Sequence, residues 1–382
     1  MGEAQLALFE PYQSARPPSK RYVFMVDVRA NGYGGLQHRD STALLCERAD
    51  LPTLAQSEQP RTDAYLVFLG LCSHEYFHAW NVKRIKPVPF VYYDFSNIVD
   101  TSLLWFFEGV TSYYDDLIMY RTGLLDETQY LKKLENTYNA VMRHDGVNVQ
   151  TAHDSGWYAW TKYYQVSPNT PNAVVSYYSK GALIALAMDQ FIREHSAGRF
   201  SLDDVMRDLW TWFGRDFYAL YPQGLARGVT EADIMASVSH FAGTDARDFF
   251  NCALHSTAAL PLRDNLGKLG VVLSEPKNSV AQLGATSKKT DGGWQIQRVL
   301  NNGAAQNAGL APDDVLLTFD RIRINAAPDD VLARVNIGAQ VMVHFLRDDV
   351  LHHTTLINSP APHGVYALSL SEGNTQVFNK TP

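Results

Sequence analysis

Residues 63–83 read DAYLVFLGLCSHEYFHAWNVK, an apolar, proline-free stretch that contains the pattern His-Glu-x-x-His. Apolar residues fall on more than one face, which is typical of a helix buried in the middle of a domain. Thr62 or Asp63 is expected to cap its amino terminus. Histidines four residues apart project from the same face of a helix, about one turn from each other. The stretch therefore predicts a buried helix that presents two imidazoles to one point.

The histidines of this pattern predict a zinc site. His74 and His78 can both ligate one Zn²⁺ at about 2.1 Å, and Glu75 then lies beside the open coordination position, where it can act as a base. The alternative is two core histidines that bond to backbone carbonyls, the commoner state of an isolated histidine. The adjacent Glu75 favours the metal site. A catalytic zinc ion still requires a third protein ligand and leaves its fourth position to water.

The third ligand is expected in a second apolar helix over residues 102–121. Glu108 interrupts an otherwise apolar face within the stretch LLWFFEGVTSYYDDL, and a buried carboxylate is costly unless it is paired or bound to a metal. Asp115 lies on the same face two turns later, where it can accept the outer N–H of a ligand histidine. Asp115 is equally compatible with a solvated or capping carboxylate. For Glu108 the alternative is a buried salt bridge with a basic residue: Lys83, Arg84 or Arg121.

The flanking sequence predicts a small sheet before these helices and a helical body after them. Residues 21–29 read as a strand, the turn residues 31–35 (NGYGG) follow, and an extended segment 36–46 comes next, so we expect a β-hairpin. Short β-type runs punctuated by Gly, Asn and Asp predominate near the carboxy terminus, which indicates a domain boundary near residues 261–268. Between these regions, helical patterns occupy residues 126–144, 176–195, 201–214, 230–240 and 245–254.

Composition excludes several classes of protein. The chain has 382 residues, 46% of them hydrophobic and 19% charged, which is too apolar for a disordered protein and long enough for two packed domains or more. The formal net charge of −7 gives no reason to bind a phosphate backbone or an anionic membrane, so neither nucleic acid nor a membrane is an expected partner. Three widely spaced cysteines argue against a disulfide framework, and no signal-peptide pattern opens the chain. The location stays open, with the cytoplasm favoured.

Three separated segments resemble a known family. They are HEYFHAWNVKRIKP (74–87), WFFEGVTSYYDDLIMYRTGL (105–124) and VSYYSKGALIALAMD (175–189). In this order they resemble the glycyl aminopeptidase family of PDZ-containing gluzincin zinc metallopeptidases, relatives of the thermolysin-like aminopeptidases. The resemblance spans about residues 20–360. The family normally carries a β-rich domain before the catalytic one, and this chain is expected to lack it.

The resemblance implies a role for each site residue. The zinc ligands would be His74, His78 and Glu108, which bind one zinc ion per chain. Glu75 would act as the general base. Tyr178, the tyrosine just before Ser-Lys-Gly, would donate a hydrogen bond to the oxyanion. Tyr177 is the alternative for that role, and it is also compatible with a core aromatic.

The segment GYGGLQHRDST (32–42) resembles the substrate-binding strand of the family. The resemblance implies that a substrate peptide binds along Gly34, Gly35, Leu36, Gln37 and His38. Glycines allow a peptide to lie close to an exposed strand edge, and an ordinary hairpin turn is the alternative. The commoner family pattern has Glu where this chain has Gln37, and a neutral amide holds a substrate ammonium less well. An endopeptidase therefore remains an alternative to an aminopeptidase.

The segment GGWQIQRVLNNGAAQNAGLAPDDVLLTFD (292–320) resembles a bacterial PDZ domain. Such domains bind a peptide as an added strand and receive its terminal carboxylate in a loop of backbone N–H groups. Leu283-Gly284-Ala285 is the expected loop, and the implied partner is a carboxy-terminal peptide. A module that only packs against the catalytic domain is the alternative.

Together these patterns predict an α+β protein in two parts. Residues 1–262 are expected to form a thermolysin-like, mostly helical catalytic domain with a small amino-terminal sheet, and residues 263–382 a β-rich PDZ domain with a tail. The predicted activity is zinc-dependent hydrolysis of peptides or proteins, and the resemblance implies an aminopeptidase that favours amino-terminal Gly or Ala. The alternatives are a PDZ-assisted endopeptidase and a catalytically weak peptide-binding protein with a structural metal.

Overall fold

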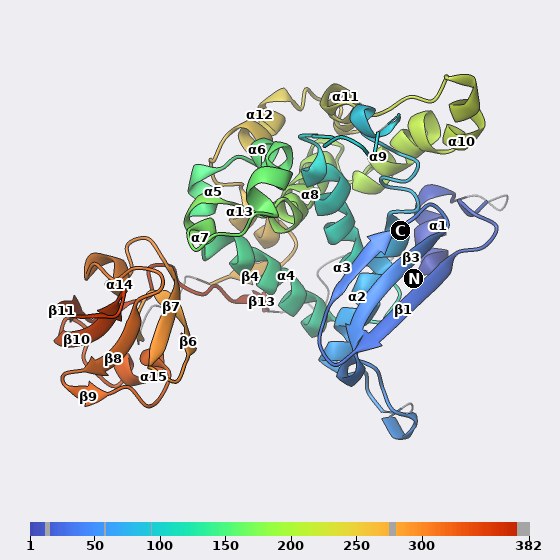
Figure 1. The fold of residues 1–382 in the computed structure, drawn as a ribbon. Coiled ribbons are helices and arrows are strands. Elements are labelled where there is room, and N and C mark those ends of the chain that lie inside the picture. Colours follow the sequence, from blue (N-terminus) through green and yellow to red (C-terminus); the bar gives the residue numbers. More distant parts are fainter. Residues whose placement is uncertain (12–15, 57–58, 93, 275–279, 373–382) are drawn as a thin grey trace.

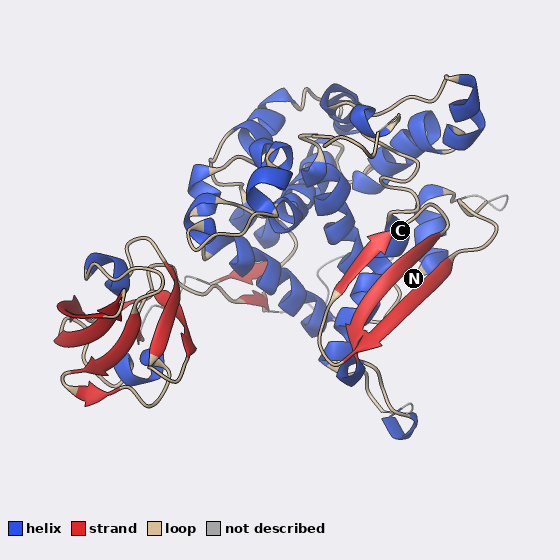
Figure 2. Cartoon of the chain, viewed as in Figure 1, coloured by secondary structure: helices blue, strands red, loops and turns tan. Residues whose placement is uncertain are grey.

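The architecture is mixed α+β, as the sequence predicts. Figure 1 shows a helical body with a small sheet (blue) on one side and a β-rich unit (orange to red) on the other. Figure 2 shows that the strands gather in these two places and in one short pair between them. Within the described part of the chain, none of the helices combines the length and the apolar character that crossing a bilayer requires. The structure, a computed structural model, describes residues 1–11, 16–56, 59–92, 94–274 and 280–372.

The amino-terminal sheet has three strands, and their pairing differs from the expected hairpin. The central strand β3 (Ser41–Glu47) pairs in parallel with β1 (Val23–Arg29) and antiparallel with β2 (Gly34–Gln37). The predicted hairpin between residues 21–29 and 36–46 was therefore wrong. Every second residue of β3 is buried, whereas β1 is largely exposed, so β3 takes the centre and β1 an edge. The glycine-rich segment forms the other edge strand, β2, instead of a turn.

Helix α2 (Asp63–Phe77) carries His74, is capped at its carboxy end by His78, and packs against β2 and β3. Its predicted cap is confirmed, because the Thr62 hydroxyl accepts a hydrogen bond from the Tyr65 N–H at 3.2 Å. The helix ends at His78, before the expected residue 83. Val82 adopts a φ of 115°, outside the helical region, so the chain turns away within one turn of the histidine.

The second predicted helix is continuous but not uniform. Residues Trp105–Val110 form a π-helical turn (η4), and α3 (Thr111–Arg121) follows it directly. Helix α8 (Tyr177–His195) crosses this turn closely. A side chain at Gly109 would overlap the main chain of Gly181, so the two glycines set how near the helices lie.

The predicted helical patterns correspond to α4, α8, α9, α11 and α12, and the body contains further helices that were not predicted. A hydrophobic cluster that includes Trp80, Trp105 and Tyr114 fills the space between them. The α-helices are α1 (Gly2–Phe9), α4 (Glu127–Met142), α5 (Gly146–Val149), α6 (Ala152–Trp157), α7 (Thr170–Ala173), α9 (Leu202–Leu209), α10 (Phe217–Leu220), α11 (Glu231–Ala242), α12 (Arg247–His255) and α13 (Leu262–Lys268). Shorter helical turns are η1 (Arg48–Asp50), η2 (Leu54–Gln56), η3 (Val88–Phe90), η5 (Ala159–Tyr163), η6 (Trp210–Gly214) and η7 (Tyr221–Gln223).

The carboxy-terminal unit is built on a sheet with the strand order β11-β10-β8-β7-β6, and β9 pairs with β8. Its own hydrophobic cluster includes Ile296, Leu316 and Val343. The strands are β5 (Ala281–Gln282), β6 (Ala285–Lys289), β7 (Trp294–Val299), β8 (Val315–Phe319), β9 (Ile322–Arg323), β10 (Gln340–Arg347), β11 (Val350–Ile357) and β12 (Ser359–Pro360). The helices are α14 (Ala304–Asn307) and α15 (Pro328–Leu332).

A short strand pair lies between the two parts. Strands β4 (Val271–Leu273) and β13 (Leu368–Leu370) are antiparallel, and both Val271 and Leu273 belong to the hydrophobic cluster of the helical body. Residues just beyond the predicted boundary thus pack on the body. The division into 1–262 and 263–382 stays a prediction.

Candidate metal centre

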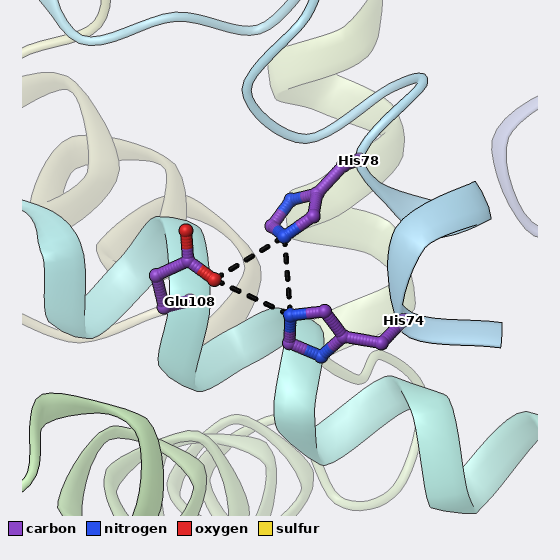
Figure 3. Close-up of side chains that lie close together, drawn as sticks. All are labelled: His74, His78 and Glu108. Carbon is purple, nitrogen blue, oxygen red and sulfur yellow. Dashed lines mark hydrogen bonds and ion pairs between the residues drawn. The ribbon is translucent and has the colours of Figure 1, made fainter. Parts of the chain in front are cut away.

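Three predicted ligands converge at the junction of α2 and η4. His74 and His78 come from the end of α2, and Glu108 comes from the π-helical turn (Figure 3). The two Nε2 atoms lie 3.1 Å apart, and Glu108 Oε2 lies 3.3 Å from His74 Nε2 and 3.2 Å from His78 Nε2. Three ligand atoms of the types that zinc prefers therefore face one point.

The outer nitrogens of both rings are held by acceptors. His78 Nδ1 lies 2.8 Å from the Asn81 main-chain oxygen, and His74 Nδ1 lies 2.9 Å from Asp115 Oδ2. A carbonyl or carboxylate oxygen can only accept, so both Nδ1 atoms donate, and each ring, when it is neutral, turns the lone pair of its Nε2 inward. This is the arrangement in which outer partners orient metal-ligating histidines.

The donor set fits a zinc ion. Two nitrogen lone pairs and a carboxylate oxygen at this separation repel one another unless a proton or a cation lies among them. A tetrahedral zinc ion with bonds of about 2.0–2.1 Å separates its ligand atoms by about 3.3 Å. The observed separations of 3.1 to 3.3 Å agree with that value.

The electrostatics of the cluster also favour positive charge. Burial lowers the pKa of His74, but the hydrogen bonds to the Asp115 and Glu108 carboxylates outweigh it and raise this pKa to about 10. Burial raises the pKa of Glu108, whereas the charge of His78 and the hydrogen bonds from both imidazoles lower it to about 2. The Glu108 carboxylate is thus ionised at neutral pH and attracts a proton or a metal ion to the imidazoles.

The alternative salt bridges of Glu108 are not formed with the predicted basic residues. Arg121 pairs with Asp203 at 3.0 Å, and Arg84 pairs with Asp40 at 3.2 Å. Among the described residues, no ion pair joins Glu108 to Lys83; its partners are the two histidines. The geometry therefore favours the ligand interpretation over the structural one.

Glu75 lies next to the cluster and faces the glycine-rich strand. Its Oε2 atom is buried and has no hydrogen-bond partner among the described residues, which leaves it available to a group in the cavity. Burial raises the pKa of Glu75, and the nearby charges of His78 and His74 oppose the shift. A Cβ atom at Gly35 would overlap the Glu75 carboxylate, so the absence of a side chain at this position allows Glu75 to lie where it does.

A cavity of about 370 Å³ surrounds these groups. Three of the five predicted substrate-strand residues, Gly34, Gly35 and Gln37, line it. Leu36 and His38 are exposed and lie outside the lining, because alternate side chains of β2 point away. The other lining residues are Tyr33, Leu71, His74, Glu75, His78, Glu108, Ser112, Asp115 and Tyr178.

Tyr178 rather than Tyr177 reaches this cavity. The Tyr178 ring lies 6.2 Å from the His74 ring, centre to centre, whereas Tyr177 is buried and donates its hydroxyl to Tyr164 at 3.1 Å. Burial and the nearby Glu108 carboxylate raise the pKa of Tyr178 well above its usual range. Its hydroxyl therefore stays protonated and can donate a hydrogen bond.

Some residues of this centre had no sequence prediction. Asn81 contributes only its main-chain oxygen, which no side-chain pattern reveals. Tyr164, whose hydroxyl lies 3.5 Å from that of Tyr178, belongs to the aromatic run WYAWTKYY (157–164), and that run is the only signal that could have indicated it.

Comparison with known proteins bears on the same region. Residues 67–184 match the model of the M61 glycyl aminopeptidase family. The resemblance to this family is confirmed. The M61 match includes His74, Glu75, His78, Glu108 and Tyr178, and it ends before the carboxy-terminal unit.

One solved structure is similar to the whole chain. The crystal structure of an aminopeptidase N family protein from Idiomarina loihiensis is 35% identical, with a TM-score of 0.88, over 100% of this chain. The chain spans 65% of the length of that protein. A search of curated proteins finds no match.

Two shorter likenesses concern about a fifth of the chain. The HtrA-type protease AlgW with a decapeptide is 23% identical, with a TM-score of 0.21, over 22% of this chain and 30% of that one. A serine endoprotease from Yersinia pestis is 20% identical, with a TM-score of 0.19, over 21% of this chain and 29% of that one. At these TM-scores they carry no argument.

The predicted carboxylate-binding loop lies outside the M61 segment. The Leu283 N–H donates to the Asp329 carboxylate of α15 at 2.7 Å. A peptide carboxylate would compete with Asp329 for this donor. The PDZ assignment and its peptide ligand stay predictions.

Proposed function

We propose that the protein is a gluzincin-type zinc metallopeptidase, an aminopeptidase that acts on peptides with amino-terminal Gly or Ala. The observation that carries the proposal is the convergence of two imidazole nitrogens and one carboxylate oxygen within 3.3 Å of one another, beside a buried carboxylate. The M61 match and the aminopeptidase-family neighbour support the reaction class. The preference for Gly and Ala rests on the family alone.

In this proposal each residue has a separate task. His74, His78 and Glu108 would hold the zinc ion, which when bound polarises the scissile carbonyl and lowers the pKa of water. Glu75 takes the proton of the attacking water and passes it to the leaving amine. The Tyr178 hydroxyl donates to the oxyanion as the carbonyl becomes tetrahedral. The free edge of β2 binds the peptide backbone.

Metal removal is the direct test of this function. The purified protein is expected to contain one zinc ion per chain and to hydrolyse Gly- and Ala-p-nitroanilide. A chelator should reduce the rate to background, and stoichiometric zinc should restore it, as measured by absorbance and metal analysis. Undiminished hydrolysis by the metal-stripped protein would refute the proposal.

Endopeptidase action is a second candidate, and one observation favours it. Gln37, a neutral amide, lines the cavity at the position where the commoner family pattern has a carboxylate for the substrate ammonium. Comparing free and amino-acetylated forms of one Ala peptide distinguishes the two. An aminopeptidase cleaves only the free form, whereas equal rates identify an endopeptidase.

Gly35→Ala is expected to lower kcat/KM by about 10- to 100-fold, because the new methyl group displaces the Glu75 carboxylate from its position. The melting temperature should change little, since the displaced group is the end of a flexible side chain. Gly267→Ala in α13 is the matched control, because its Cβ meets nothing within 4 Å and it does not line the cavity. Equal activity of the two variants, measured on Ala-p-nitroanilide, would contradict the assigned place of Glu75.

A further inference from the structure

A second, larger cavity adjoins the metal centre. It measures about 620 Å³, and Gln37 and Glu108 belong to the lining of both cavities, so the two are adjacent. Much of its wall is apolar or aromatic and includes Phe90, Leu104 and Trp160. This volume far exceeds what the side chain of Gly or Ala fills, so the cavity has room for a further part of a substrate.

Two lysines give this cavity a cationic wall. Lys83 and Lys86 both line it, and Lys86 is buried with its ammonium 5.2 Å from the centre of the Phe217 ring. Lys83 is partly buried, and its main-chain N–H donates to the carbonyl of His78 at 3.0 Å. Among the described residues, the Lys83 ammonium forms neither a hydrogen bond nor an ion pair. An ammonium that is partly removed from water and has no counter-ion among these residues is less stable than a paired one, and an anion in the cavity would pair with it.

The acidic groups near Lys83 do not replace such an anion. Glu108 and Glu75 act on the Lys83 ammonium electrostatically without contacting it, and both face the metal centre. Asp94 and Asp100 also line the cavity, but both are exposed. The Asp94 carboxylate already accepts from the Ser96 N–H at 2.8 Å and the Asn97 amide at 2.7 Å.

We infer that this cavity binds a carboxylate of the peptide substrate and that Lys83 is the residue that holds it. The inference rests on the proposed function and names a substrate class for it: peptides with an acidic group near the scissile bond. A substrate ammonium at this place would meet two lysines, and a neutral group would leave Lys83 unpaired. The carboxylate comes either from an Asp or Glu side chain or from the carboxy terminus of a short peptide.

Peptide binding tests this inference without requiring turnover. In the zinc-loaded Glu75→Gln protein, calorimetry compares tetra-alanine amide that has a free amino terminus with versions that carry Asp, or its neutral partner Asn, at each position in turn. A further version has a free carboxy terminus. We expect one carboxylate peptide to bind at least about 10-fold more tightly than its neutral partner, as a charged hydrogen bond predicts.

Substitution of Lys83 then assigns the difference. Lys83→Met should reduce the ratio between the carboxylate and neutral peptides to below about twofold, and Lys83→Arg should keep it. Lys132→Met, which removes an exposed lysine of α4, is the matched control and should also keep it. Tight binding of an Asp peptide identifies a side chain as the source, and tight binding of the free-acid peptide alone identifies the carboxy terminus.

Two outcomes would overturn the inference. One is that each carboxylate peptide binds no more tightly than its neutral partner to the protein with Lys83 intact. This measurement does not depend on whether a lysine variant folds. The other is a ratio that persists in Lys83→Met. Failure of the proposed function would look different. If the unsubstituted protein bound these peptides but hydrolysed none of them, the peptidase function would be refuted and the carboxylate site would remain.

Discussion

Glu75→Gln is expected to lower kcat for peptide hydrolysis by about 10³-fold, within the range of roughly 10²- to 10⁴-fold that general acid–base catalysis contributes. Glutamine keeps the size of the side chain but cannot take a proton from water. The zinc content should stay at one ion per chain, because Glu75 is not among the three converging ligands. Stopped-time assays on Ala-p-nitroanilide and metal analysis of the same sample give both quantities.

The control for this variant is Glu3→Gln. Glu3 is an exposed residue of α1, so its substitution removes the same charge from the surface and should leave kcat unchanged. If Glu75→Gln turned over as fast as this control, Glu75 would lose its assignment as the base. If Glu75→Gln lost its zinc instead, the loss of activity would say nothing about proton transfer, and a ligand role would replace the present one.

Glu108→Ala is expected to abolish activity by a different route, the loss of metal. Removal of an outer partner of a ligand typically costs 10- to 100-fold in metal affinity, and removal of a ligand itself should exceed that. We expect a zinc affinity more than about 100-fold lower and hydrolysis at background under substoichiometric zinc. Competition with a fluorescent chelator measures the affinity.

Glu75→Gln also serves as the matched control for Glu108→Ala. Both variants remove one carboxylate charge from the same cavity, and only Glu108 has an oxygen within 3.3 Å of both histidines. Equal zinc affinity of the two variants would exclude Glu108 as the third ligand. Circular dichroism of the metal-free proteins checks that the buried site tolerates alanine.

The helical body was predictable because its signals are local. Apolar periodicity and a capping threonine suffice to place α2, and similar patterns place α4, α8 and α11. Strand pairing is not local. Alternation along residues 21–29 and 36–46 shows that strands form, but it does not show that β3 lies between β1 and β2. The early end of α2 was not predictable, because the residues that follow Phe77, HAWNVK (78–83), include neither glycine nor proline.

The candidate site, like the fold, was predictable where its signals are local. His74, His78 and Glu108 were predictable because each places a polar group on an apolar helix, and burying such a group is unfavourable unless it is paired or bound to a metal. The substrate strand was predictable only in part, since Leu36 and His38 lie outside the cavity. The Asn81 carbonyl was not predicted, because it comes from the turn after α2 and not from a motif, and Lys83 was considered only as a salt-bridge partner of Glu108.

The crossing of η4 and α8 has a wider consequence. Gly109 follows Glu108, Gly181 lies within a turn of Tyr178, and neither can gain a side chain without overlapping the opposite main chain. Glu108 and Tyr178, though distant in the chain, are therefore held by two helices whose backbones lie against each other. On the other side of the cavity, β2 is an edge strand, so the two walls of the site differ in how far neighbouring backbone restrains them.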